Sequence, residues 1–209
     1  MILMIAITGG PGAGKTTCFD YLKEHKEKLM INNFIPLFIP ETATFLLDNN
    51  LTSRSDLLSF QTDISKYQLE QEDRVINNCI KSFKNQGNCE KTNYIIFCDR
   101  GLMDGKAFLN EEMFSEVMKN TGLKESEIFG RYDYVIHLIS PARECPDNYT
   151  LKTNKNRTEN ITEAGIIDKR TEEVWKDHPG YISIGNKAGV PGKYKEVLKL
   201  SIDLIRART

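Results

Sequence analysis

The residues with the clearest capacity for chemistry form the run GGPGAGKTT at positions 9–17. It satisfies the pattern GxxxxGK[ST], and it stands between an apolar run and a helical pattern, the context in which this pattern binds phosphate. Glycines let backbone N–H groups converge on phosphate oxygens, and the start of a helix adds partial positive charge. Lys15 would reach the β- and γ-phosphates, and the Thr16 hydroxyl would bind Mg²⁺.

This run therefore predicts a phosphate-binding loop (P-loop) for a nucleoside triphosphate, either ATP or GTP, together with Mg²⁺. The residues expected to contact the nucleotide are Gly9, Gly10, Pro11, Gly12, Ala13, Gly14, Lys15, Thr16 and Thr17.

A second candidate pair, Asp99 and Arg100, follows the apolar run YIIFC. Asp99 at a strand end could bind Mg²⁺ directly or through water, or it could cap the following helix. An enzyme that hydrolyses a nucleotide usually orients water with a carboxylate or an amide, but here the next residue is a cation. A guanidinium can bind an anionic acceptor or neutralise charge that develops during transfer. Arg100 favours phosphoryl transfer over rapid hydrolysis, unless it is a structural arginine paired with a nearby acid.

Glu41 is a third candidate, because it follows the apolar run 34–39 in the segment PETAT. A kinase that acts on a hydroxyl benefits from a carboxylate that hydrogen-bonds the attacking O–H and can take its proton. The alternative is that Glu41 serves as an N-cap partner for a helix that begins near Thr42 or Thr44.

The elements that must position these residues alternate along the chain. Short apolar runs without polar alternation, typical of strands buried on both faces, occur at 2–7, 34–39, 94–98, 134–139 and 181–184. Helical patterns occur at 15–28, 56–83, 103–120 (broken), 161–176 and 193–207. This alternation predicts a three-layer, doubly wound α/β fold with a parallel sheet. Ligands bind such sheets at the carboxyl ends of the strands, where Glu41 and Asp99 stand.

The long helical pattern at 56–83 carries an uncharged stripe of Gln61, Ser65 and Gln68 that ends in Glu72. The spacing places these side chains on one face, which either lines an acceptor pocket or is solvated. Its apolar residues lie on other faces and are expected to pack on the sheet; they include Leu57, Phe60, Ile64, Ile76 and Ile80. Asp104 could orient Arg100 or stand at a helix start.

Two segments near the predicted site are less specific. Residues 144–160 are almost free of apolar side chains and include Lys152, Lys155 and Arg157, so they form either a surface loop or a lid over phosphates. Asn186 and Lys187 resemble the start of the guanine-reading NKxD motif, but Gly189 replaces its acid. The loop that contains them is expected to contact the base.

Composition narrows the class of protein. The 209 residues are 40% apolar and 27% charged, which suits one globular domain over 1–209. A net charge of −1 argues against nucleic-acid binding by bulk electrostatics. The five cysteines show no metal-binding spacing, and the sequence shows neither a signal peptide nor a run long enough to span a membrane. We expect a cytoplasmic protein.

The motifs ITGGPGAGKTT, PETAT, YQLEQED, CDRGLMDGKAF, YDYVIHL, NRTENITEA and VWKDHP occur in this order. Together they resemble the AAA-type P-loop domain shared by nicotinamide riboside kinases of the NadR type and the translocation-defect proteins. The set is similar, more broadly, to thymidylate-kinase-like nucleoside and nucleotide kinases. The resemblance implies a five-stranded parallel sheet with the P-loop strand internal, Mg²⁺ with ATP or GTP, Asp99 and Arg100 at the phosphates, and Arg157 in a lid.

The combined hypothesis is a Mg²⁺-dependent P-loop kinase that phosphorylates a small nucleoside-like acceptor. Its predicted catalytic residues are Lys15, Glu41, Asp99, Arg100 and Arg157, and its predicted metal ligands are Thr16 and Asp99. Because the resembling family includes GTP-binding regulators, the alternative is a nucleotide-binding switch that hydrolyses slowly and acts through a protein partner.

Overall fold

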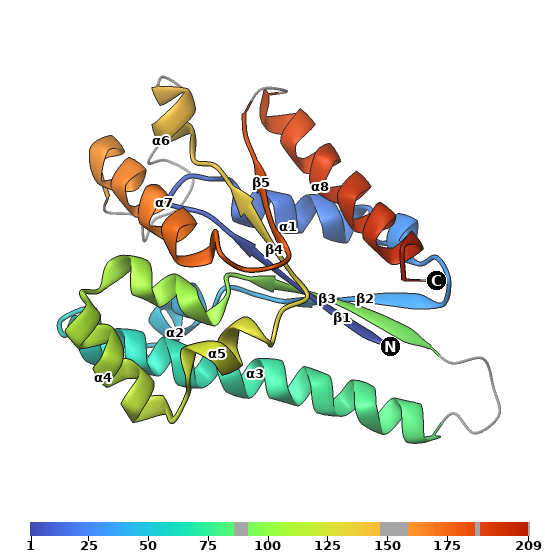
Figure 1. Cartoon of the computed structure of the whole chain (residues 1–209), viewed down its shortest axis with the longest axis horizontal. Helices are drawn as coiled ribbons and strands as arrows, with labels where there is room; N and C mark the ends of the chain where they lie inside the picture. The colour runs from blue at the N-terminus through green and yellow to red at the C-terminus, as the bar shows by residue number, and fades with distance from the viewer. Residues whose placement is uncertain (86–91, 147–158, 187–188, 209) are drawn as a thin grey trace.

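The computed structural model describes residues 1–85, 92–146, 159–186 and 189–208. They form a five-stranded, wholly parallel sheet in the order β2-β3-β1-β4-β5, with helices on both faces (Figure 1). The strands are β1 (Ile2–Thr8), β2 (Phe34–Ile39), β3 (Asn93–Asp99), β4 (Tyr134–Leu138) and β5 (Tyr181–Ile184). The predicted fold class is confirmed, and the strand that leads into the P-loop is internal.

Helices follow the strands much as the sequence patterns indicate. The α-helices are α1 (Lys15–Glu24), α2 (Thr42–Asp48), α3 (Leu57–Asn85), α4 (Glu111–Thr121), α5 (Glu125–Phe129), α6 (Pro141–Glu144), α7 (Ile161–Trp175) and α8 (Gly189–Arg206). Two 3₁₀ segments, η1 (Lys26–Leu29) and η2 (Leu102–Phe108), interrupt longer helical patterns.

Local side-chain hydrogen bonds are associated with the breaks in these patterns. The pattern at 15–28 leaves α-helical geometry at His25, whose ring nitrogen lies 2.9 Å from the carbonyl oxygen of Tyr21. The pattern at 103–120 divides because Asn110 caps a new helix, its side chain accepting a 2.8 Å hydrogen bond from the Met113 N–H. The last helix begins at Gly189, earlier than the apolar pattern predicts.

Both faces of the sheet are buried, which explains the uninterrupted apolar runs of the strands. On β1, Leu3, Ile5 and Ile7 pack with residues of α1 and α8 on one face. Met4 and Ala6 point to the other face and join residues of α3, α4 and α7. The P-loop thus starts from a strand that packing immobilises on both sides.

Helix α3 differs from the expected packing, because its first turns extend past the carboxyl edge of the sheet (Figure 1). Phe60 and Ile64 therefore line a cavity, and Leu57 and Ile80 are exposed. Of the expected set only Ile76 packs with the cluster beneath the sheet. The other α3 residues in that cluster are Leu58, Leu69, Val75, Cys79 and Phe83.

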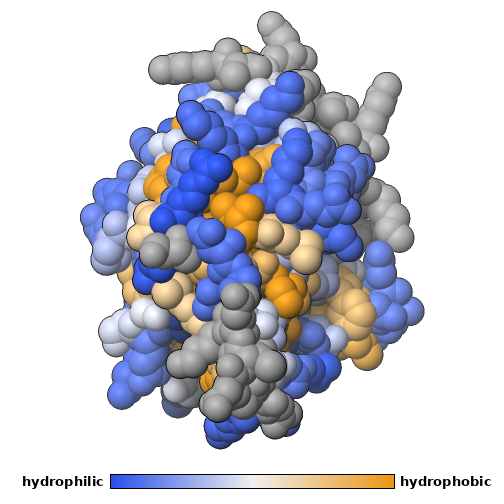
Figure 2. Space-filling model, turned by 90° about the vertical axis from the view of Figure 1, so that its right-hand side faces the viewer, coloured by the Kyte–Doolittle hydropathy of each residue, from blue (hydrophilic) through white to orange (hydrophobic). Residues whose placement is uncertain are grey.

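The amino-terminal ends of the strands lie at the opposite end of the sheet. Figure 2 shows apolar residues gathered in the middle of this face and surrounded by hydrophilic ones. The exposed Met1, Met30 and Ile35 belong to segments at this end. Within the described ranges, no helix has both the length and the apolar character that crossing a bilayer requires.

Candidate active site

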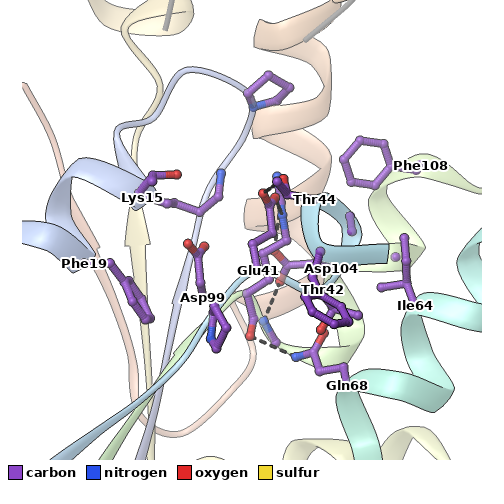
Figure 3. A pocket seen from close by; sticks show the side chains of 18 of the residues that line it. Lys15, Phe19, Glu41, Thr42, Thr44, Ile64, Gln68, Asp99, Asp104 and Phe108 are labelled. Atoms are coloured by element: carbon purple, nitrogen blue, oxygen red, sulfur yellow. Dashed lines mark hydrogen bonds and ion pairs between the residues drawn. The ribbon is translucent and has the colours of Figure 1, made fainter. Parts of the chain in front are cut away.

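Three strand ends bring the predicted site residues together. In the parallel register Ile7 lies beside Asp99, and Ile39 lies beside Cys98, so the segments after β1, β2 and β3 leave the sheet at the same edge. They open into a cavity of about 1250 Å³ that runs from the P-loop to the first turns of α3. Lys15, Glu41, Asp99 and Asp104 surround it in Figure 3.

The P-loop connects β1 to α1 as the motif predicts. Lys15 is buried, and its Nζ donates hydrogen bonds to the carbonyl oxygens of Gly9 (2.7 Å) and Gly10 (3.0 Å). Burial, assisted by the charge of Arg100, lowers the pKa of the Lys15 ammonium to about 8. The loop residues that line the cavity are Pro11, Gly12, Gly14, Lys15, Thr16 and Thr17.

Gly14 is one of the positions in the loop where glycine is required. Its φ is +89°, a conformation that other L-residues rarely adopt, and it serves as the N-cap of α1. A Cβ at this position would lie only 2.4 Å from the Tyr194 hydroxyl of α8. Backbone conformation and packing together therefore select glycine at the second glycine position of the GxxxxGK[ST] pattern.

An anchor of the P-loop that the sequence did not indicate is Asp168 of α7. Its fully buried carboxylate accepts a 2.7 Å hydrogen bond from the Gly10 N–H and a 3.1 Å bond from Arg143. His137 of β4 lies 3.3 Å from the same carboxylate. Burial alone would raise the pKa of Asp168, but His137 and the Gly10 N–H hold this pKa below its usual value. Asp168 thus fixes the P-loop backbone from the neighbouring helix.

Replacing Asp168 with alanine should lower the melting temperature, because the buried Gly10 N–H loses its partner. We expect a loss of about 1–3 kcal/mol in the free energy of unfolding, or several degrees for a chain of this size. Thermal denaturation measures it. Glu173→Ala on an exposed position of α7 is the matched control and should change stability by about 0.5 kcal/mol or less. Equal melting temperatures for the two variants would contradict the anchoring role.

Asp99 has the properties of a carboxylate that binds a cation. It is buried, and its Oδ1 has no hydrogen-bond partner within the described part of the chain. Burial and the charge of Glu41 raise the pKa of Asp99 to about 7. It does not cap η2, because that segment's Gly101 N–H donates to Asp104 instead.

The candidate metal ligands fit Mg²⁺. The side chain of Thr16 is exposed at the start of α1 and lines the same cavity as Asp99. Among the residues that the structure describes, no three His, Cys, Asp or Glu side chains form a site that could hold a metal by themselves. Mg²⁺ commonly takes one or two protein ligands and completes its octahedron with phosphate and water. One carboxylate, one hydroxyl and a triphosphate match that requirement.

Arg100 lies on the rim of the cavity. Its Nε donates to Glu41 (2.8 Å), and one terminal nitrogen donates to Asp104 (3.2 Å) and lies 3.5 Å from the Gly9 carbonyl oxygen. Its backbone φ is +82°, an unfavourable value for a residue with a long side chain. Such strain persists only where surrounding contacts impose it, and it is concentrated at functional sites.

Asp104 holds Arg100 in place, as the sequence suggested it could. Its Oδ2 also accepts a 2.7 Å hydrogen bond from the Thr8 hydroxyl, and its Oδ1 accepts a 2.8 Å bond from the Trp175 indole N–H. Both Asp104 and Trp175 are buried. Through Asp104, residues of β1, η2 and α7 together fix the position of the guanidinium. These contacts leave the Arg100 side chain little freedom to rotate.

Glu41 occupies the N-cap position of α2, but its side chain does not cap the helix. Its carboxylate instead accepts hydrogen bonds from Arg100 and from the Thr44 hydroxyl (2.6 Å). Burial alone would raise the pKa of Glu41, but the charges of Arg100 and Lys15 lower this pKa to about 2. Glu41 is therefore an anion at neutral pH that faces the cavity beside Arg100.

The stripe on α3 forms a wall of the cavity and is not an exposed outer face. Gln61, Ser65 and Gln68 are buried and line it, and Glu72 lies behind them. Gln68 donates to Glu72 and to the backbone carbonyl oxygen of Arg100, both at 3.0 Å. Glu72 is further fixed by Tyr132 (2.7 Å) and Arg131 (2.9 Å). This network ties the α3 wall to the strained residue at the rim.

The predicted base-contact loop is only partly described. Asn186 is held by protein groups: its amide nitrogen donates to Ile139 and Glu144, and its Oδ1 accepts a 2.9 Å bond from Lys193. It does not line the cavity. The buried Lys193 also donates to the Ala13 carbonyl oxygen of the P-loop, a contact that the sequence did not indicate.

Two predicted site residues, Arg157 and Lys187, lie outside the described residues, as does most of the predicted lid segment. Contacts between these residues and a nucleotide stay predictions.

Comparison with known proteins supports the assignment of the fold. One matching solved structure is thymidylate kinase from Ehrlichia chaffeensis, with a TM-score of 0.59 and 15% sequence identity. The match covers 95% of this chain and 98% of that chain. No curated protein matches the sequence. A family model described as AAA domain matches residues 4–190. The chain, with its P-loop and its five-stranded parallel sheet, belongs to this AAA domain family.

Proposed function

We propose that this protein is a Mg²⁺-dependent kinase that transfers the γ-phosphate of ATP or GTP to a small nucleoside-like acceptor in the cytoplasm. The observation that carries the proposal is the position of Arg100. Its guanidinium contacts the P-loop carbonyl of Gly9 and the carboxylates of Glu41 and Asp104, so it lies between the P-loop and the α3 wall. A cation there serves transfer to a bound acceptor better than it serves the positioning of water.

The residues divide the work between donor and acceptor. Lys15 and the backbone N–H groups of the P-loop would bind the triphosphate, and Thr16 and Asp99 would hold Mg²⁺. Mg²⁺ would supply charge neutralisation at the phosphates. Glu41 would accept a hydrogen bond from the attacking hydroxyl and orient it. Its low pKa suits this orienting role better than that of a resting proton acceptor.

Arg100 would neutralise negative charge that develops on the transferred phosphoryl group. Its contacts with Glu41 and Asp104 preorganise the guanidinium, so little reorganisation is needed at the moment of transfer. The same salt bridge to Glu41 would keep the acceptor hydroxyl and the phosphoryl group in register. A predicted role for Arg157, closure over the phosphates with exclusion of water, belongs to the same proposal.

A transfer assay tests the proposal. The protein is incubated with Mg²⁺ and γ-labelled ATP or GTP, with and without a panel of nucleosides and nucleotides, and labelled acceptor is measured against free phosphate. We expect labelled acceptor to exceed free phosphate, and chelation of Mg²⁺ to abolish transfer. Tight triphosphate binding without a labelled acceptor would contradict the kinase and favour the regulatory switch.

A further inference from the structure

Two polar side chains of the α3 wall lack partners. Gln61 and Ser65 are only 6% and 4% exposed, and both line the cavity. Their side chains make no hydrogen bond to any of the residues that the structure describes. Within the described ranges, the buried side-chain atoms that lack a partner do not include those of Gln61 and Ser65, so their polar atoms are open to the cavity. They are free to hydrogen-bond a molecule that fills it. Neighbouring Thr62 differs, since its hydroxyl donates to the Leu58 carbonyl oxygen at 2.8 Å.

The backbone opposite this pair leaves room for the glutamine amide. A Cβ on Gly105 of η2 would lie 3.0 Å from Gln61 Oε1, with no other contact closer than 3.9 Å. The amide of Gln61 therefore lies against a residue without a side chain, at the wall of the cavity. Gln61 offers both a donor and an acceptor there, and Ser65 offers a hydroxyl one turn further along the same helix.

The surfaces around the polar pair are largely apolar. Ile64 and Phe108 point into the cavity in Figure 3, and Phe60 and Phe45 also line it. Phe45 is held by stacking on Tyr67, with ring centroids 5.1 Å apart. A pocket with apolar faces and a few fixed polar groups fits a flat ring that carries hydrogen-bonding groups along its edge.

The charges beside the P-loop restrict the group that attacks the γ-phosphate. Two cations, Lys15 and Arg100, stand there among three carboxylates, those of Glu41, Asp99 and Asp104. Arg100 is already paired with Glu41 and Asp104. A phosphate in the attacking position would lie beside the Glu41 anion with no unpaired guanidinium to receive it, whereas a hydroxyl could donate to that anion.

The two other cations of the lining, Lys23 and Arg54, make contacts with groups outside this cluster of carboxylates. Lys23 on α1 lies 3.9 Å from Asp20 and over the Phe19 ring. Arg54, in the exposed segment before α3, lies over the Phe60 ring at 5.7 Å. Neither stands among the carboxylates that surround the reaction centre.

From these observations, and resting on the proposed function, we infer that the acceptor carries no phosphate. It is an uncharged molecule with a hydroxyl group and a heterocyclic ring, and Gln61 and Ser65 recognise the polar edge of that ring. The site is thus built for an unphosphorylated nucleoside-type acceptor and not for a nucleoside monophosphate.

Matched acceptor pairs test the charge of the acceptor. Each common nucleoside and its 5′-monophosphate are compared as acceptors under saturating triphosphate and Mg²⁺. We expect kcat/KM for the best nucleoside to exceed that of its monophosphate by about 100-fold or more, the scale of a buried group left unpaired. An equal or better monophosphate would overturn this inference and leave the kinase proposal standing. Transfer to neither series, with triphosphate still bound, would refute both.

Substitutions on the α3 wall test the recognition of the ring. Ser65→Ala and Gln61→Leu should each raise the acceptor KM by about tenfold, a factor typical of one lost hydrogen bond, with the triphosphate KM unchanged. Thr62→Val is the matched control, because its hydroxyl faces the helix and not the cavity. Retained triphosphate binding reports correct folding for every variant. An acceptor KM that is the same in the native protein and in all of these variants would overturn the assignment of Gln61 and Ser65.

Discussion

Replacing Arg100 with alanine should lower the rate of phosphoryl transfer by about 10³-fold or more, the effect that an arginine at the transferring phosphoryl group has in comparable enzymes. The loss should fall on kcat, because the guanidinium acts mainly on charge that develops in the transition state. Triphosphate affinity, measured separately by titration, should change much less. Arg100→Lys keeps a charge but cannot reproduce the fork that contacts Glu41 and Asp104, so it should recover only part of the rate.

The same residue offers a control for its strained backbone. Alanine must still adopt the φ of +82°, whereas glycine adopts it without penalty. Arg100→Gly should therefore be more stable to heat than Arg100→Ala by about 1 kcal/mol, yet equally impaired in transfer. If Arg100→Ala transferred phosphate normally and only melted earlier, the arginine would be a structural partner of the two carboxylates and the proposed function would lose its main support.

Much of this fold could be predicted from short segments of sequence. Strands buried on both faces need continuous apolar runs, so each of the strands β1 to β5 can be recognised from its own short segment of sequence. The P-loop is also local, since its strand, glycines, lysine and helix are contiguous. The position of Glu41 and Asp99 then followed from one rule, that parallel strands present their carboxyl ends at the same edge. Fold and family were confirmed on these grounds.

The supporting residues could not be found in the same way, because they depend on contacts between distant parts of the chain. Asp168 bonds to the backbone of Gly10, 158 positions away, and in sequence it is an ordinary acid of a helix. Lys193 reaches Ala13 from 180 positions away. Such partners follow from the packing of α7 and α8 on the sheet, which no local pattern encodes.

Helix α3 shows why an amphipathic pattern alone can mislead. Its apolar residues were assigned to the sheet by periodicity, but periodicity does not reveal where the sheet ends. Because the first turns extend beyond that edge, Phe60 and Ile64 border a cavity and the stripe of amides beside them is buried. Gln61 and Ser65 are shielded from the outer surface but open to the cavity, and this placement distinguishes a recognition surface from an exposed helix face.

Replacing Glu41 with glutamine should reduce kcat for phosphoryl transfer by about 10²- to 10⁴-fold, the range expected for a carboxylate whose charge orients and polarises the attacking hydroxyl as its proton leaves. Glutamine has nearly the same shape and can still accept the Thr44 hydrogen bond, so the loss would report the missing charge. Triphosphate affinity should be little changed. The rate of the native enzyme should not titrate with Glu41 between about pH 5 and 8, because Arg100 and Lys15 hold that carboxylate ionised, with a pKa of about 2.

Thr44→Val provides the graded comparison, because it removes the hydroxyl that donates to Glu41 at 2.6 Å and leaves the carboxylate charged. Since Arg100 still holds the carboxylate from the other side, we expect this variant to lose about tenfold in kcat or less. If Glu41 orients the hydroxyl through its charge, Glu41→Gln should lower kcat far more than Thr44→Val, which removes only one hydrogen bond to the carboxylate. If Glu41→Gln instead weakened triphosphate binding as much as it slowed transfer, Glu41 would belong to the donor site and the acceptor hydroxyl would need another partner.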